Sequence, residues 1–108
     1  MFVDMKFKCL FMAHVPDCDP EEDYEKLETD KYAFYVNFVK DQENALEVAK
    51  KYREEKGIQS LILCPGFTNE EVGELSEALD GVSVNVARGD GPSGRIAQEA
   101  MQKAGWFE

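Results

Sequence analysis

Residues 58–79, IQSLILCPGFTNEEVGELSEAL, predict a buried strand that runs directly into a helix. The strand part, Ile58–Cys64, is short, mostly apolar and bounded by a glycine and a proline, which is typical of a central strand covered on both faces. The helix part opens with Thr68 and Glu71 at the spacing of a capping box, in which each side chain satisfies a backbone N–H of the other residue. A strand followed at once by a capped helix is the repeating unit of α/β proteins.

The alternation of strands and helices extends in both directions from this stretch. Predicted strands cover 5–14, 32–40, 58–64 and 82–88, and predicted helices with their capping residues cover 19–28, 41–57, 68–81 and 93–105. The pattern predicts one domain over residues 1–108, a small three-layer α/β sandwich of about four mostly parallel strands. We favour the strand order 2-1-3-4, with right-handed crossovers that place helices on both faces of the sheet. Residues 15–31 barely supply the dozen residues that a parallel connection requires, so an antiparallel first strand is the alternative.

The first and last predicted helices rest on capping signals. Asp19 is the expected N-cap of the acidic helix 19–28. Ser93 is the expected N-cap of the last helix, Gly105 its left-handed end, and Trp106 is expected to fold back onto the final turn. The residues expected to face inward from this last helix are Ile96, Ala97, Ala100, Met101 and Ala104.

Composition excludes several classes of protein. The chain has 108 residues, with 22 acidic and 12 basic side chains and a net charge of −10, which repels phosphate backbones, so we expect neither nucleic acid nor membrane partners. No apolar run reaches the roughly 18 residues of a membrane helix, and the start MFVDMKFKC lacks the pattern of a secretory signal, so a cytoplasmic location is expected. Three cysteines without paired spacing predict free thiols rather than a disulfide framework or a zinc site.

The segment YVNFVKDQENALEVAKKYREEKGIQSLILCPGFTNEEVGELSEAL carries a family resemblance. Its features are a helix with Ala45 and Ala49, a strand ending in Leu63-Cys64-Pro65-Gly66-Phe67, and a later valine-rich strand that runs to Arg88. In these features most of the chain resembles a family of small bacterial and archaeal proteins filed as a domain of unknown function. The resemblance supports the α/β fold and implies no activity and no functional residue.

Chemistry is expected at the carboxyl ends of the strands, because ligands of open parallel sheets bind there. With the order 2-1-3-4, the first and third predicted strands are neighbours, which brings His14 beside Cys64. A neighbouring imidazole favours the reactive thiolate, so Cys64 as nucleophile and His14 as base are the candidate catalytic residues. The structural alternative is that Cys64 is a small apolar residue closing a buried strand and that His14 only hydrogen-bonds a carboxylate or backbone group.

The segment GDGPSG, residues 89–94, matches G-x-G-x-x-G between a predicted strand and a predicted helix. Too few residues follow Gly94 to supply the acidic residue of a dinucleotide site, and Pro92 removes a backbone donor, so no cofactor is expected. The segment is typical of an ordinary glycine-rich turn, and the alternative is a site that holds a small phosphate or carboxylate through backbone N–H groups and the helix dipole. The candidate ligand-binding residues are Arg88, Gly89, Gly91 and Ser93 in this turn, with Gly66, Phe67 and Thr68 at the start of the preceding helix.

Two further segments have the composition of a metal site or of a self-association surface. The acidic residues of 17–23 lack the glycine that a calcium loop needs at its sharp turn, so they are interpreted as a solvated helix start and no metal is expected. The aromatic strand YAFYVNFV, residues 32–39, predicts either burial beneath helices on both faces or a face that meets another copy, which leaves a homodimer open.

Three functions follow from these features. We favour a binding or accessory module that holds a small anionic metabolite at the carboxyl edge of the sheet. The alternatives are a small enzyme that uses Cys64 and His14, with backbone N–H groups around Phe67 and Thr68 as an oxyanion or phosphate cradle, and a self-associating structural or interaction protein.

Overall fold

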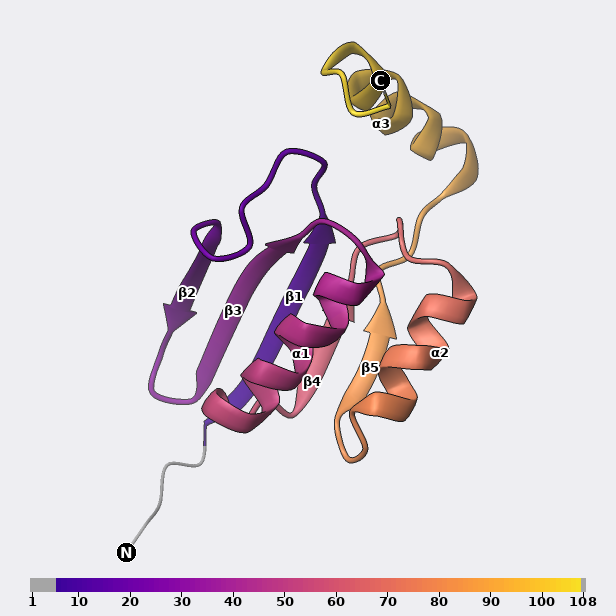
Figure 1. The fold of residues 1–108 in the computed structure, drawn as a ribbon. Coiled ribbons are helices and arrows are strands. Elements are labelled where there is room, and N and C mark those ends of the chain that lie inside the picture. Colours follow the sequence, from indigo (N-terminus) through magenta and orange to yellow (C-terminus); the bar gives the residue numbers. More distant parts are fainter. Residues whose placement is uncertain (1–5, 108) are drawn as a thin grey trace, which may run out of the picture.

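A five-stranded sheet organises the computed structural model, which describes residues 6–107 (Figure 1). The strands are β1 (Phe7–His14), β2 (Tyr24–Glu28), β3 (Tyr32–Val39), β4 (Ser60–Leu63) and β5 (Ser83–Val86), and the helices are α1 (Gln42–Lys56), α2 (Asn69–Ala78) and α3 (Gly91–Lys103). The strand order is β2-β3-β1-β4-β5. Within it β1 pairs in parallel with β3 and β4, and β5 pairs in parallel with β4. The predicted small, mostly parallel α/β fold is confirmed. The four predicted strands correspond to β1, β3, β4 and β5, and their order in the sheet, β3-β1-β4-β5, is the favoured order 2-1-3-4. Met5, predicted to start the first strand, lies outside the described residues.

The predicted helix 19–28 is wrong, because most of it is the antiparallel edge strand β2. Leu27 lies opposite Phe34 in the ladder that β2 forms with β3. Residues 19–23 do form a single helical turn, in which Asp23 N donates to Asp19 O at 2.8 Å and Asp19 N donates to Asp23 Oδ2 at 2.8 Å. The chain then leaves this turn for the free edge of β3, where alternate residues of β2 gain ladder hydrogen bonds and their neighbours gain cross-strand contacts, which together outweigh helical propensity.

The expectation of helices on both faces of the sheet is also wrong for the described helices. The helices α1 and α2 contact each other, and they lie on the same face, α1 against β1 and β3 and α2 against β5 (Figure 1). The two right-handed crossovers from β3 to β4 and from β4 to β5 run in the same direction, which places both helices on one side. The first connection contains β2 instead of a helix, so it adds nothing to the other face.

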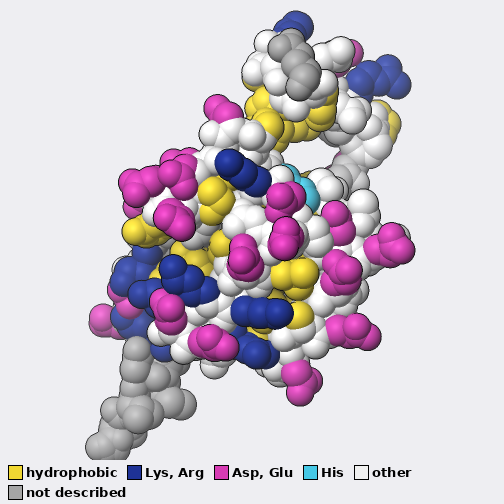
Figure 2. Space-filling model, in the orientation of Figure 1, with side chains coloured by type: hydrophobic (Ala, Val, Ile, Leu, Met, Phe, Trp, Pro, Cys, Tyr) yellow, Lys and Arg dark blue, Asp and Glu magenta, His cyan; other side chains and the backbone are white. Residues whose placement is uncertain are grey.

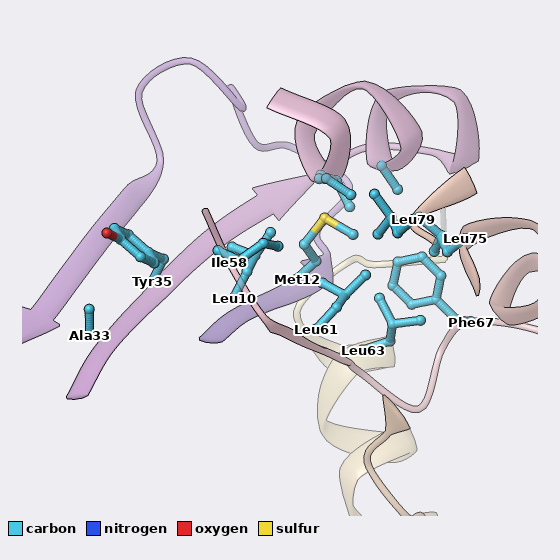
Figure 3. Close-up of a cluster of buried hydrophobic side chains, with 13 residues drawn as sticks. Leu10, Met12, Ala33, Tyr35, Ile58, Leu61, Leu63, Phe67, Leu75 and Leu79 are labelled. Carbon is cyan, nitrogen blue, oxygen red and sulfur yellow. The ribbon is translucent and has the colours of Figure 1, made fainter. Parts of the chain in front are cut away.

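The hydrophobic core lies between this face of the sheet and the two helices. Figure 3 shows Met12, Leu61 and Leu63 of the strands directed towards Leu75 and Leu79. All five side chains are almost completely buried, and α1 contributes two buried alanines that let it approach the sheet closely. The core therefore fixes β1 and β4 side by side, which positions the residues at their carboxyl ends.

The helix ends mostly follow the sequence signals. The predicted capping box of α2 is present, and α1 begins after Asp41, whose side chain accepts from Asn44 N, and ends at the left-handed Gly57. Trp106 N donates to Met101 O at 3.0 Å beyond a left-handed glycine, which is the Schellman ending expected of α3.

Two predictions for α3 are wrong. The helix begins one turn earlier than Ser93, with Asp90 as N-cap and Pro92 in its first turn, where a missing N–H costs no hydrogen bond. None of its residues is buried, because α3 projects beyond the carboxyl edge of the sheet instead of packing on it (Figure 1). The residues predicted to face inward therefore have no core of this chain to face.

A buried polar cluster ties the loop before β2 to α1. Asn37 accepts a hydrogen bond from the Tyr52 hydroxyl at 2.8 Å, and its amide donates to Pro20 O at 3.1 Å. Burial raises the pKa of the Tyr52 hydroxyl. A raised pKa means that the folded protein holds this proton more tightly than the unfolded chain does, so the resulting stability is present at neutral pH and is lost as pH rises past the ordinary tyrosine value of about 10.

Tyr52→Phe is expected to lower the unfolding free energy by about 1–3 kcal/mol at pH 7, because Asn37 loses a buried partner. Near pH 11 the difference from the wild type should shrink, because the variant has no hydroxyl to titrate. Urea unfolding at both pH values measures this difference. Tyr24→Phe, at an exposed tyrosine, is the control; a Tyr52→Phe penalty that stays constant with pH contradicts the interpretation.

Candidate functional site

An open cleft of about 1020 Å³ lies between the carboxyl edge of the sheet and α3. The sheet side contributes His14, Lys40 and Cys64, and the helix side contributes Gly91, Arg95 and Trp106. In the space-filling view, the single histidine, drawn in cyan, borders the opening beneath the C-terminal segment (Figure 2). The cleft lies at the edge where the residues after β1, β3, β4 and β5 come together, as expected of a parallel sheet.

His14 and Cys64 are brought together by the parallel pairing of β1 with β4. The backbone N–H of His14 donates to Cys64 Sγ at 3.4 Å, and Cys64 N donates to Met12 O at 3.1 Å, which extends the ladder past β4. The His14 ring stacks on Phe67 at 4.0 Å between centroids, and its Nε2 is buried without a hydrogen-bond partner. No hydrogen bond joins the imidazole to the thiol within the part of the chain that the structure describes.

Gly66 leaves a gap that the thiol and the imidazole share. A Cβ at this position would lie 3.5 Å from Cys64 Sγ and 3.8 Å from His14 Nδ1, both at ordinary van der Waals distance. The absence of a side chain at Gly66 therefore keeps both reactive atoms open towards the same small volume of the cleft.

The backbone donors expected around Phe67 and Thr68 are already used. Phe67 N donates to Cys64 O at 3.3 Å, and Thr68 N donates to Glu71 Oε1 at 2.9 Å. The capping box at the start of α2 thus consumes the Thr68 N–H, and the turn before it consumes the Phe67 N–H, which are the two donors that a cradle for an oxyanion or phosphate would need. In this arrangement neither N–H is free to bind an anion.

The glycine-rich turn contributes to the cleft through its glycines and not through Arg88. The Arg88 side chain is 84% exposed and pairs with Asp90, its Nε donating to Oδ1 at 2.9 Å, so it does not join His14 and Cys64. Gly89, Gly91 and Gly94 line the cleft, whereas Ser93 is exposed on α3 and does not. Because Asp90 binds Arg88, its side chain makes no capping bond to the first turn of α3.

Lys40 is a lining residue that the sequence reasoning missed. It directly follows β3, so the rule that selects the residues after the other three parallel strands would also have found it. Together with Arg95 it brings two cations to the cleft, and the acidic lining residue, Asp90, is paired with Arg88. The cleft is therefore locally positive in a protein of net charge −10.

Among residues 6–107, no group of three or more His, Cys, Asp or Glu side chains is placed to hold a metal ion. No helix in the same range combines the length and the apolar character needed to cross a membrane.

Comparisons with other proteins identify a family and no function. The model of a family described as "Family of unknown function (DUF6506)" matches residues 5–102, which confirms the predicted resemblance to small proteins with a domain of unknown function. No curated protein and no solved structure matches the chain. The role of the cleft must therefore be argued from its own residues.

Proposed function

Because the chain belongs to DUF6506, a family of unknown function, we propose its function from the cleft alone: it binds a small anionic metabolite between the carboxyl edge of the sheet and α3. The observation that carries the proposal is the positive lining of this cleft in an acidic protein. The ligand class is a phosphate or carboxylate attached to a partly apolar body.

The charge of the lining favours an anion over a cation. Lys40 and Arg95 approach the cleft from opposite sides, one after β3 and the other on α3. Asp90 is paired with Arg88, so its carboxylate is largely compensated. A ligand anion placed here meets two cations, whereas the acidic remainder of the surface repels it.

The start of α3 adds backbone donors. Gly91 lines the cleft at the first turn of the helix, where the Asp90 side chain makes no capping bond, whereas the N–H of Gly94, which also lines the cleft, already donates to Asp90 O. Glycines allow an oxygen ligand to approach the backbone, and the positive end of the helix dipole favours negative charge there. Met101 and Trp106 line the same cleft and supply an apolar wall for the rest of the ligand.

Arg95→Gln is expected to weaken binding of an anion by about 10- to 150-fold, the factor that corresponds to roughly 1.5–3 kcal/mol for a hydrogen bond to a charged group. The measurement is isothermal titration after a thermal-shift screen with inorganic phosphate, citrate and nucleoside monophosphates, with the matching neutral nucleosides for comparison.

Lys103→Gln is the matched control, because it removes one positive charge from the same helix at a residue outside the cleft lining. Equal loss of affinity in both variants would show a general charge effect. If no anion in the panel raises the melting temperature, the proposed function is wrong.

A second candidate function, thiol chemistry at Cys64, is favoured by one specific observation. The backbone N–H of His14 donates to the Cys64 sulfur and stabilises negative charge that develops on it. The gap at Gly66 gives a substrate access to the thiol and to His14 Nδ1 together. In this function Cys64 is the nucleophile and His14 the base, which has to come within hydrogen-bond reach of the thiol proton when substrate binds.

A further inference from the structure

The face of the sheet opposite α1 and α2 carries an apolar strip along β1 and β3. Side chains alternate along a strand, and Leu10 and Met12 face the helices, so their neighbours face the other way. We define the strip by six residues of this second face: Phe7, Phe11, Tyr32, Phe34, Val36 and Phe38. Phe7 stacks on Tyr32 at 5.6 Å, and Tyr32 contacts Phe34 at 6.0 Å between ring centroids.

No described helix covers this strip. Phe7 is 48% exposed and Tyr32 is also exposed. Ile62 of β4 extends the strip on one side, and beyond it the face becomes polar at Asn85 of β5. On the other side, β2 places Glu25 opposite Val36. The strip is therefore an apolar band that reaches the exposed Leu27 of β2, opposite Phe34, and has the polar residues Glu25 and Asn85 at its sides, which is typical of a surface that meets a partner.

The helix α3 has an apolar stripe that also lacks a partner. Its members recur at helical spacing and are Ile96, Ala97, Ala100, Met101 and Ala104. Ile96 is 71% exposed, and no residue of α3 is buried. Arg95, Gln98 and Glu99 occupy the polar side of the helix. One chain thus displays an amphipathic helix and an uncovered sheet face at the same time.

The connection before α3 keeps it away from its own strip. Ala87 N donates to Leu63 O at 2.7 Å, which extends the ladder beyond β5. Gly89 lies near Pro65, since a Cβ added at Gly89 would lie 3.7 Å from Pro65 Cβ, and the Arg88–Asp90 ion pair closes the turn. These contacts direct α3 beyond the carboxyl edge of the sheet (Figure 1). Laying α3 on the strip of its own chain would require them to break.

We propose that the strip is covered by the α3 helix of a second copy, in a two-fold symmetric dimer whose copies exchange this helix reciprocally. Exchange of an identical element is a low-cost route to a dimer, because each copy supplies both surfaces. The two surfaces also match in size: α3 is about 20 Å long, and the strip is about 26 Å long and wide enough for a helix about 10 Å across.

The area and the charges fit a stable dimer. Each copy contributes one strip and one helix. Taken as flat areas, without the relief of the side chains, these two surfaces together measure about 500 Å², which approaches the roughly 800 Å² per partner of a standard interface. Neither the strip nor the apolar stripe contains a charged side chain, so association removes no carboxylate of this acidic chain from water. Ile96 lies on the side of α3 away from the cleft lining, whereas Ala97 and Met101 of the same stripe line the cleft, so the dimer interface and a bound ligand would share this part of the apolar wall.

The test begins with the oligomeric state of the full chain, measured by sedimentation from 1 to 100 µM. A dimer is expected, and Ile96→Glu should raise its dissociation constant at least about 100-fold while the circular dichroism of the monomer stays unchanged, because Ile96 is exposed in the single chain. Gln98→Glu makes the same change in charge on the polar side of α3 and should leave the dimer intact.

A cross-linking experiment identifies which helix covers the strip. The photoreactive p-benzoylphenylalanine replaces Phe34, and light and ¹⁵N-labelled copies are mixed before illumination. Cross-links from this position to residues 91–104 of the other isotopic chain are expected. A monomer at 100 µM, a dimer that Ile96→Glu does not weaken, or cross-links confined to one chain would each overturn the exchange. None of these results depends on ligand binding, so the proposed function is tested separately.

Discussion

Cys64 is expected to react with iodoacetamide at pH 8 at least about 1000-fold faster than Cys9 in the folded protein. Cys64 lines the cleft, whereas Cys9 is 1% exposed within the central strand β1 and reacts only when the sheet opens. Opening a core strand costs about 4 kcal/mol or more, which corresponds to this factor. Cys18 is 4% exposed, and burial together with the nearby Asp23 carboxylate raises its pKa, so less of it is thiolate and it should also react slowly.

The rates are read separately for each cysteine by mass spectrometry of the intact protein followed by peptide mapping. Gly66→Ala should slow only Cys64, because the new methyl group lies 3.5 Å from its sulfur. His14→Asn retains the backbone N–H that points at the sulfur but removes the imidazole, so it separates these two contributions. If Cys64 is alkylated only upon unfolding, its thiol is closed to the cleft and the nucleophile function is wrong.

Leu75→Ala is expected to lower the unfolding free energy by about 2–5 kcal/mol, a large part of the 5–15 kcal/mol typical of a small domain. Leu75 is the fully buried residue of α2 and packs into the core (Figure 3). Its loss removes apolar contact and leaves a cavity under the helix. Chemical denaturation monitored by circular dichroism measures the change.

Gly73→Ala on the same helix is the control of opposite sign. The new methyl group meets nothing within 4 Å, and alanine loses less backbone entropy than glycine in a helix, so stability should rise by about 0.5–1 kcal/mol. Equal effects of the two substitutions would mean that α2 does not depend on its contact with the sheet.

Local signals predicted the strands and helices that have a buried face within this chain. The capping box of α2 and the left-handed Gly57 after α1 lie where the sequence placed them, because each satisfies hydrogen bonds that depend only on nearby residues. The predicted helix 19–28 is wrong although its partner is close in sequence: Asp19 makes a genuine helical turn, but only residues 29–31 separate β2 from β3, and pairing in this hairpin outweighs the helical signal.

The periodicity of α3 correctly predicted a helix. The prediction that its apolar side packs on the core of the same chain was wrong. A stripe such as Ile96 to Ala104 reveals that one side of a helix is apolar, but it does not reveal which surface covers that side. The predicted covering surface was the core of the same chain. The uncovered strip on the sheet of a second copy is the surface that we propose covers this stripe instead.

The candidate site could be predicted in outline from the strand order alone. The proximity of His14 and Cys64 follows from the adjacency of β1 and β4, which the short apolar segments predicted. The use of the Thr68 N–H by Glu71 follows from the capping box that the sequence predicts, whereas the pairing of Arg88 with Asp90 instead of the cleft was not predictable. Such choices depend on distances that the order of residues does not contain.

The central position of β1 in the sheet has a consequence for synthesis of the chain. β1 pairs with β3 and β4, both of which follow it in the sequence, so one of its edges has no partner until residues 32–39 have been made and the other has none until residues 60–63 have been made. At about 5–20 residues per second, a ribosome needs roughly 2–10 s to pass from His14 to Leu63. During that interval the apolar segment FKCLFMAH has at least one unpaired edge, and Lys8 inside it, with Lys6 just before it, is the kind of charged gatekeeper that limits aggregation of such a segment.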